Sequence, residues 1–327
     1  MKPVNKQKIL LVGPYPPPHG GISTHVAELE RQWRDAGVRC RVLDTGRVGM
    51  RFFAGVVRFA CAGWTLHVHT NGHNRKSWVL AGICGLVGRS PVLTLHSGMA
   101  PAYLLGAGGR LGNPPQAGSL PHNGDGLPYW ICKSFKRIVC VNAAIRDALV
   151  AIGVPEKKLE IKPAFIEPQR GEFPLNPLLR AWMGRHSPVF STTLFFRPEY
   201  GFEFLVSALA KLRRTHPSLG CVVMGSGEEQ GNAERLVRES GLQDNIFFAG
   251  DVSHESCLAV MSRSDVFLRP TFADGDSVSV REALALGVPV VASRVGTRPD
   301  DAILFEAGDR EDLCARVEQA LKQHVIA

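Results

Sequence analysis

The sequence predicts an α/β protein in two domains, each with a parallel β-sheet and helices between the strands. Short apolar runs, such as residues 8–12, alternate with helical patterns, such as residues 22–36. Glycine-rich turns follow several of the expected strands, at the places where α/β proteins bind ligands. The length of 327 residues exceeds the size at which a single hydrophobic core usually stops growing, so two domains are expected.

Residues 1–165 are expected to form the first domain. Asn142 can cap one of its helices, because its side-chain oxygen can accept a hydrogen bond from the first turn. The apolar segment at residues 52–60 fits either a core helix, which we favour, or a helix in a membrane interface. The expected strands are 8–12, 39–43, 65–69, 91–95, 137–141 and 158–162, and the other helices are 22–36, 77–87, 129–135 and 143–152.

A second domain is expected over residues 189–327, after a linker at residues 166–188. The linker is rich in proline and lacks hydrophobic periodicity. The segment at 202–216 carries apolar residues on one helical face, as a helix packed on a sheet does. The other expected elements are the strands 191–196, 220–224, 245–248, 266–268 and 290–292 and helical segments at 259–264 and 311–323.

Composition indicates a globular protein of a reducing compartment. The chain is 45% hydrophobic and 21% charged, which excludes a wholly disordered chain. Its eight cysteines show neither C-x-x-C pairs nor zinc-type spacing, and no secretory signal is recognisable. We therefore expect reduced thiols, no metal site and a cytoplasmic location. No apolar run reaches the ~20 residues that a membrane-spanning helix needs.

Charge is divided unevenly along the chain. Residues 1–165 carry a net charge of +13, whereas residues 166–327 carry −5. A basic half favours an acidic partner such as a lipid phosphate, an anionic membrane surface or nucleic acid. The alternative is that these charges are solvated helix faces without a binding role.

The most informative stretch lies between Asp274 and Gly287. Ser277 or Ser279 can cap a short helix that Gly287 ends. Asp274 and Glu282 lie on either side of the helix N-terminus, whose free N–H groups favour an anion such as a phosphate. This arrangement fits a nucleotide sugar, with a carboxylate for hydroxyl groups and amides for the diphosphate. A capped helix with two solvated acids is the alternative.

Two further loops are candidate binding sites. Gly20 and Gly21 lack dinucleotide-fold and P-loop spacing, but adjacent glycines before a helix let the backbone approach a phosphate. His96 directly follows a strand, at the edge of the sheet where ligands bind. His67 and His69 share one strand face. They can bind a metal, but we favour a strand pair whose hydrogen bonds are satisfied, because no third ligand is evident.

Residues 106–128 are dense in glycine, proline and asparagine. A loop of this length inside a compact domain is usually either functional or disordered, and both interpretations stay open here.

The stretch from Asp274 to Ser293 resembles the donor-site signature of family-4 glycosyltransferases. In that signature an acid-Gly-x-Gly-x-x-x-x-Glu-Ala run precedes Gly-x-Pro-Val-Val-Ala-Ser. The chain is similar to the family over residues 8–320, most strongly over residues 190–295. The resemblance implies the GT-B architecture, in which two Rossmann-like α/β domains face each other across a cleft. It also implies a UDP- or GDP-linked sugar as donor and no cofactor.

The same resemblance implies roles for individual residues. Glu282 would hold the nucleotide ribose, and Asp274 and His96 would orient the donor sugar. Arg197 is the cation nearest to a segment that the family fills with Gly-Arg-x-x-x-x-Lys-Gly, so it would neutralise the diphosphate. Tyr200 stands at the lysine of that segment. The donor-binding residues are expected to be Gly20, Gly21, Gly225, Ser277, Val278, Ser279 and Glu282.

The implied function is that of a retaining, metal-independent hexosyltransferase acting on a glycan or lipid-linked acceptor in polysaccharide or cell-envelope biosynthesis. Its implied location is cytoplasmic, at the anionic inner face of a membrane, with no nucleic-acid partner. One alternative is a UDP-sugar epimerase of the same fold. Another is a non-catalytic homologue that binds a nucleotide or a regulatory partner. Asp274 in place of the usual Glu, Ser277 in place of a glycine and Tyr200 in place of a lysine favour this last alternative.

Overall fold

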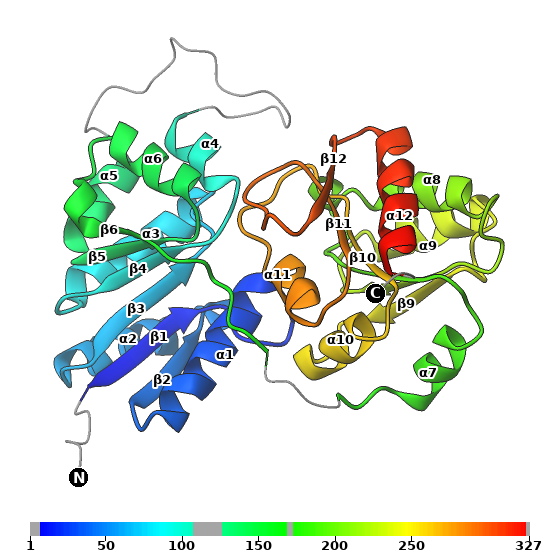
Figure 1. Cartoon of the computed structure of the whole chain (residues 1–327). Helices are drawn as coiled ribbons and strands as arrows, with labels where there is room; N and C mark the ends of the chain where they lie inside the picture. Colours follow the sequence, from blue (N-terminus) through cyan, green and yellow to red (C-terminus); the bar gives the residue numbers. More distant parts are fainter. Residues whose placement is uncertain (1–6, 107–125, 169–172, 325–327) are drawn as a thin grey trace. The chain divides into compact units, whose positions relative to one another are not determined.

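The computed structural model describes residues 7–106, 126–168 and 173–324. The described residues form two α/β units, each with a parallel sheet of six strands (Figure 1). The first unit consists mainly of residues up to Ile166 and the second mainly of residues from Glu167 onward. Most of the loop expected at residues 106–128 lies outside the described residues.

The N-terminal sheet has the strand order β2-β1-β3-β4-β5-β6. Its strands are β1 (Lys8–Gly13), β2 (Arg39–Asp44), β3 (Thr65–Thr70), β4 (Val92–Leu95), β5 (Arg137–Cys140) and β6 (Leu159–Ile161). The direction of winding reverses between β1 and β3, and such a reversal opens a crevice beyond the carboxyl ends of these two strands. The loops after β1 and β3 therefore lie where ligands bind in this type of sheet.

Helices cover the N-terminal sheet, with α2, α3 and α5 packed in a row and α4 against α6 (Figure 1). They are α1 (Gly21–Asp35), α2 (Met50–Cys61), α3 (Arg75–Val87), α4 (Ala100–Leu104), α5 (Leu127–Ser134) and α6 (Ala143–Ala151), with short 3₁₀ turns η1 (Thr45–Arg47) and η2 (Glu156–Lys158). Phe52, Val56 and Ala60 of α2 are buried at four-residue spacing, which confirms a core helix. Asn142 caps α6 as predicted, since its Oδ1 accepts from the N–H of Ile145 at 3.0 Å.

The C-terminal sheet has the strand order β12-β11-β10-β7-β8-β9. Its strands are β7 (Val189–Thr193), β8 (Gly220–Met224), β9 (Ile246–Gly250), β10 (Val266–Arg269), β11 (Val290–Ser293) and β12 (Ile303–Phe305). This order places the reversal of winding between β7 and β10. The strand expected at 191–196 begins and ends earlier in the structure, because residues after Thr193 turn into the loop at this crevice.

The C-terminal helices are α7 (Pro177–Met183), α8 (Phe202–Leu212), α9 (Gln230–Glu239), α10 (His254–Met261), α11 (Val278–Ala285) and α12 (Arg310–His324), with the 3₁₀ turn η3 (Pro198–Tyr200). Helix α7 lies within the range that the sequence suggests as a linker, and its Leu179 and Trp182 belong to the apolar cluster that contains Val189. The helical segment expected at 259–264 begins earlier, at His254, because the Ser253 hydroxyl caps α10.

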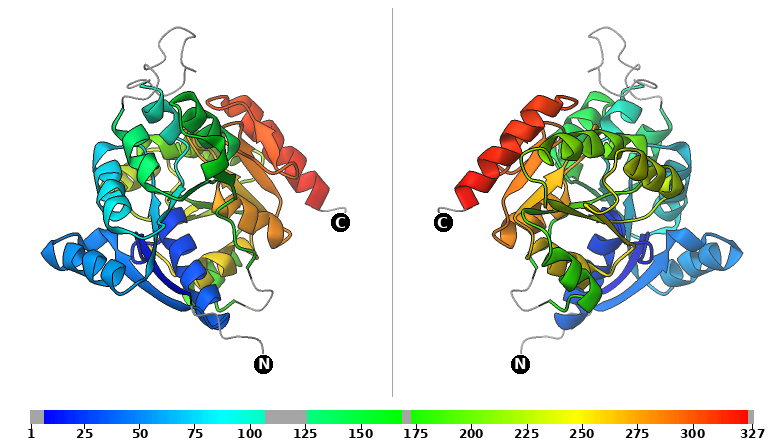
Figure 2. Two further views of the ribbon diagram at one scale, coloured as in Figure 1. Left: turned by 90° about the vertical axis from the view of Figure 1, so that its left-hand side faces the viewer. Right: turned by 90° about the vertical axis from the view of Figure 1, so that its right-hand side faces the viewer.

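Side chains of the C-terminal sheet alternate between two apolar clusters. On β8, Cys221 and Val223 belong to the cluster beneath α8 and α12, whereas Val222 and Met224 belong to the cluster beneath α7, α10 and α11. Helix α12 packs on β11 and β12 (Figure 2). Because both faces of the sheet are covered, its strands are mostly apolar, with Ser191 and Thr192 of β7 among the buried exceptions. The sheet edge at the carboxyl ends of the strands is left for polar side chains.

Candidate functional site

Helix α11 begins and ends where the sequence predicts. Ser277 is its N-cap, with its Oγ accepting from the N–H of Val280 at 3.5 Å and lying 3.1 Å from the Oγ of Ser279. Gly287 follows the helix at φ 77°, a left-handed conformation that glycine adopts readily. Val288 then donates to the carbonyl of Ala283 at 2.9 Å, which closes the end of the helix.

Glu282 is a buried acid on α11. Only 4% of its surface is exposed, and its Oε1 lies 2.7 Å from Nε2 of His254, the first residue of α10. A carboxylate removed from water needs such a partner, because desolvation disfavours the charged form. Glu282 is therefore held in place at the junction of two helices, and the alternative of a solvated acid is wrong for this residue.

Arg269 is a buried cation that sequence reasoning missed. It is 8% exposed at the carboxyl end of β10, and its Nη1 donates to the carbonyl of Thr193 at 2.7 Å. Its guanidinium also lies 5.3 Å from the ring centre of Tyr200. Arg269 thus joins the ends of β7 and β10 at the reversal of winding. In the sequence, Arg269 is visible only as an arginine directly after an expected strand. Its position at the reversal of winding can be recognised only when the strand order is known.

Arg298 supplies a second cation at the same edge of the sheet. It follows β11, its Nε donates to the carbonyl of Ser293 at 3.1 Å, and its Nη2 donates to Oγ1 of Thr271 at 3.2 Å. The hydroxyl of Ser293 donates in turn to the carbonyl of Thr271 at 2.6 Å. These bonds fix the loop that leads from β10 toward α11.

Arg197, the predicted diphosphate cation, is exposed at the start of η3. Its guanidinium lies 5.8 Å from the ring centre of Phe195. Tyr200, which replaces the family lysine, is the residue over which Arg269 lies. Gly201 has φ 69°, and a Cβ there would lie 2.1 Å from the carbonyl oxygen of Pro270. The loop after β7 therefore packs closely on the loop after β10, and the positive charge missing at position 200 is present at Arg269.

Gly225, a predicted donor-binding residue, has a backbone conformation and a close neighbour that require glycine at this position. Its φ is 133°, and a Cβ would lie 1.8 Å from the carbonyl oxygen of Leu194. Asp274 lies in the loop between β10 and α11, where its Oδ1 accepts from the N–H of Gly275 at 3.0 Å. The structure thus places Gly225 at the end of β8 and Asp274 beyond β10.

The N-terminal candidates lie after β1 and β4. Gly21 is the exposed first residue of α1, directly after Gly20. His96 follows β4, and its Nε2 is 3.1 Å from Nδ1 of His69. Burial lowers the pKa of both imidazoles well below the usual value, with further lowering by neighbouring histidines. The hydrogen bonding of His67 is satisfied as expected, because its Nε2 bonds to Oγ1 of Thr94 at 2.8 Å. Nε2 of His69, in contrast, has no partner among the described residues.

One group of side chains could hold a metal ion in the part of the chain that the structure describes. It consists of His25, His69 and His96, and one nitrogen of each lies within 4.8 Å of the others. The two partners of His69 in this group, His25 and His96, come from α1 and from the end of β4, far from β3 along the chain.

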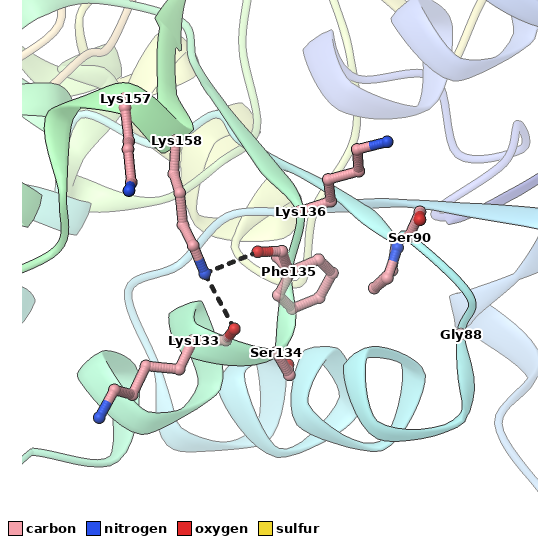
Figure 3. A pocket seen from close by; sticks show the side chains of 9 residues that line it. Gly88, Ser90, Lys133, Ser134, Phe135, Lys136, Lys157 and Lys158 are labelled. Atoms are coloured by element: carbon pink, nitrogen blue, oxygen red, sulfur yellow. Dashed lines mark hydrogen bonds between the residues drawn. The ribbon is translucent and has the colours of Figure 1, made fainter.

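A separate cavity of about 460 Å³ lies at the opposite edge of the N-terminal sheet (Figure 3). Its walls precede β4, β5 and β6, so it faces the amino ends of the strands, away from His96. Lys133, Lys136 and Lys157 are exposed there. Lys158 is half-buried, and its Nζ donates to the carbonyls of Lys133 at 2.9 Å and Phe135 at 3.0 Å. We call this cavity the lysine pocket.

Residues 187–323 match the family model described as Glycosyl transferases group 1. A phosphatidyl-myo-inositol mannosyltransferase of Propionibacterium freudenreichii is 26% identical over 299 residues, which are 84% of this chain and 74% of that protein. A GDP-mannose-dependent alpha-(1-6)-phosphatidylinositol monomannoside mannosyltransferase of Mycolicibacterium smegmatis is 30% identical over 118 residues, 34% of this chain and 31% of that protein. Several curated relatives are matched over less than two thirds of their own length.

Among solved structures, the chain is similar to Anabaena Alr3699/HepE in complex with UDP-glucose. The TM-score is 0.67 at 15% identity, and the match covers 96% of this chain and 90% of that one. At this level of identity the likeness concerns the fold alone, and it agrees with the α/β fold in two domains that the resemblance implied.

Proposed function

We propose that the protein is a glycosyltransferase, because residues 187–323 match the family model described as Glycosyl transferases group 1. The protein transfers a hexose from a nucleotide-diphosphate sugar to a glycan or lipid-linked acceptor in polysaccharide or cell-envelope biosynthesis. The observation that carries this proposal is the buried Glu282 of α11, the helix of the family signature, whose carboxylate is held by His254 of α10.

The names of relatives support a nucleotide sugar and a lipid-linked acceptor. One relative is described as GDP-mannose-dependent, and one similar structure holds UDP-glucose. Two relatives are described as acting on phosphatidylinositol lipids. We accordingly propose UDP or GDP as the nucleotide of the donor, with a membrane lipid carrying the acceptor.

The donor site is proposed along the carboxyl edge of the C-terminal sheet. Glu282 accepts hydrogen bonds from the ribose hydroxyls, and the first-turn N–H groups of α11 face the diphosphate together with Arg269 and Arg197. Charge grows on the diphosphate as the bond to the sugar breaks. Fixed cations and amides aimed at that charge stabilise the transition state. Asp274 and His96 orient the sugar.

We propose that transfer retains the configuration at the sugar and that no divalent metal serves the diphosphate. Support for retention comes from the resemblance of residues 274–293 to retaining enzymes, which are thought to use a front-face mechanism without a protein nucleophile. Support for the second point comes from the arginines at the switch between β7 and β10, which supply the positive charge that a metal would otherwise bring.

The lysine pocket supports contact with an anionic membrane surface. Nζ of one of its exposed lysines, Lys133, lies 4.4 Å from the ring centre of Trp130, an apolar side chain that is 56% exposed. Lysines attract anionic lipid, while apolar groups enter the interface. None of the described helices has the length and apolarity that crossing a membrane requires.

Calorimetric titration of UDP, GDP and ADP tests the donor site. We expect the wild type to bind UDP or GDP and Glu282→Ala to bind it at least about tenfold more weakly, because a hydrogen bond to a charged group contributes about 1.5–3 kcal/mol. Glu239→Ala is the control, since this acid is exposed on α9 in the same domain. A wild type that binds none of the three nucleotides, or a folded Glu282→Ala with unchanged affinity, would contradict the assignment.

A further inference from the structure

Three histidines from three separate elements meet at the carboxyl edge of the N-terminal sheet. His25 lies in α1, His69 in β3 and His96 directly after β4. One nitrogen of each lies within 4.8 Å of one nitrogen of the other two, and His69 Nδ1 is 3.1 Å from His96 Nε2. The ring centre of His25 is 5.5 Å from that of His69 and 5.3 Å from that of His96.

Two nitrogens of this cluster are buried without a hydrogen-bond partner among the described residues. They are Nδ1 of His25 and Nε2 of His69. Only 2% of the surface of His69 is exposed. An unpaired buried polar group costs about 1–3 kcal/mol, so native structures rarely keep one without a purpose. These nitrogens therefore point to a ligand that is not a protein group.

The bonding of His25 leaves a lone pair in the cluster. Its ring is hydrogen-bonded to the backbone of Ala164, and this bond stabilises the charged form, as a carbonyl acceptor does. Since Nδ1 has no partner, Nε2 is the nitrogen that donates. In a neutral imidazole the other nitrogen then carries the lone pair. A histidine that binds a metal shows this same pattern, with one nitrogen donating to a carbonyl and the other coordinating.

A metal ion binds an imidazole through a free lone pair, which each neutral imidazole ring offers on one of its two nitrogens. A set of nitrogens suits zinc-like transition metals, whereas Mg²⁺ and Ca²⁺ prefer oxygen.

We propose that His25, His69 and His96 bind one divalent transition-metal ion of the zinc type, in a site with an open fourth position. The site ties α1 to β3 and β4, goes beyond the proposed transfer reaction and shares His96 with the proposed sugar site.

Metal titration of the whole protein, untagged and stripped with chelator, tests the proposal. We expect one Zn²⁺ per chain by calorimetry, no uptake of Mg²⁺, and a Co²⁺ form whose visible spectrum shows nitrogen ligation at four- or five-coordinate geometry. His25→Gln and His69→Gln should each weaken Zn²⁺ binding by more than about 100-fold, since even outer partners of a metal ligand are worth about 10–100-fold.

His67→Gln is the matched control. It removes a histidine of the same strand whose Nε2 bonds to Thr94, outside the cluster. It should leave Zn²⁺ affinity within about threefold of wild type, well below the loss from an outer partner of a ligand. Nucleotide titration of each variant checks the C-terminal domain separately and distinguishes failure of this proposal from failure of the donor site.

Three outcomes would overturn the metal site. They are no Zn²⁺ uptake by the wild type, unchanged affinity in folded His25→Gln or His69→Gln, and an equal loss in His67→Gln. If one variant fails to fold, the Co²⁺ spectrum of the wild type decides: a six-coordinate spectrum overturns the site.

Discussion

At the scale of single residues, Arg197 and Arg269 are the two candidates for binding the diphosphate of the proposed donor. Arg197 is the one that sequence similarity indicates, but it is exposed, whereas Arg269 is buried at the switch between β7 and β10. A buried guanidinium is preorganised, because its fork geometry is already fixed by the bond to the Thr193 carbonyl. We therefore expect Arg269 to contribute more than Arg197.

Arg269→Ala should weaken binding of the nucleoside diphosphate by about 10- to 100-fold, the value of a hydrogen bond to a charged group. Binding of the bare nucleoside should stay unchanged, because it has no phosphate. Arg197→Ala should show a smaller difference between the same two ligands. Competition calorimetry with UDP and uridine, or with GDP and guanosine, measures both. A loss of nucleoside binding equal to that of the diphosphate would assign Arg269 a structural role only.

Gly225 offers a prediction about stability. Alanine at this position would combine a positive φ with a Cβ 1.8 Å from the Leu194 carbonyl oxygen, so the loops after β7 and β8 would have to separate. We expect Gly225→Ala to lower stability by more than about 3 kcal/mol, the range of severe backbone strain.

Gly231→Ala is the control for that prediction. Gly231 lies on the exposed side of α9, and a Cβ there would meet nothing within 4 Å. Alanine should therefore raise stability by about 0.5–1 kcal/mol through helix propensity. Thermal unfolding followed by calorimetry should move in opposite directions for the two variants. Equal changes in unfolding temperature for the two variants would show that the loops after β7 and β8 can move apart at little cost in stability, which would contradict the prediction.

At the scale of elements, the sequence predicted what local chemistry decides. The cap at Ser277, the helix end at Gly287 and the cap at Asn142 each depend on residues within one turn, and all three are confirmed. The role of Arg269 could not be predicted in the same way, because it depends on strand order. The histidine cluster was missed for a similar reason, since its members come from elements far apart along the chain.

The cap of α11 should have a measurable effect on stability. Ser277→Ala removes the oxygen that accepts from Val280, and loss of such a cap costs about 1 kcal/mol. That loss corresponds to a fall of about 4 °C in the unfolding temperature of a domain of this size. Ser279→Ala removes only the partner of the Ser277 hydroxyl, so its effect should be smaller. A larger loss for Ser279→Ala would identify Ser279 as the functional cap.

At the scale of the whole molecule, the uneven distribution of charge along the chain indicates which surface of the N-terminal domain attracts an anionic partner. The net charge of +13 belongs to residues 1–165, which include the lysine pocket. The pocket faces the amino ends of the strands, whereas His96 and Gly21 lie at the carboxyl ends. The proposed membrane contact at the pocket and the proposed substrate binding at the other edge therefore use different surfaces of one domain.

Replacement of Lys133, Lys136 and Lys157 by glutamine tests this separation. Each lysine near an anionic surface contributes about 1 kcal/mol, so the triple variant should bind anionic vesicles about 100-fold more weakly. Binding of the wild type should fall as salt rises, because surface charges are screened within about 8 Å at physiological ionic strength. Nucleotide affinity should stay unchanged in the triple variant. Flotation with vesicles of anionic and of neutral lipid measures the effect.

The control removes the same number of positive charges from another surface. Arg185, Arg214 and Lys322 are exposed in the C-terminal domain, and their replacement by glutamine changes net charge equally. If attraction depended on net charge alone, both triple variants would lose vesicle binding to the same extent. We expect only the pocket variant to lose it, because electrostatic attraction to a surface acts within a Debye length. Equal losses of vesicle binding would contradict a role for the pocket. They would not affect the assignment of Glu282 to the donor site, which nucleotide titration tests separately.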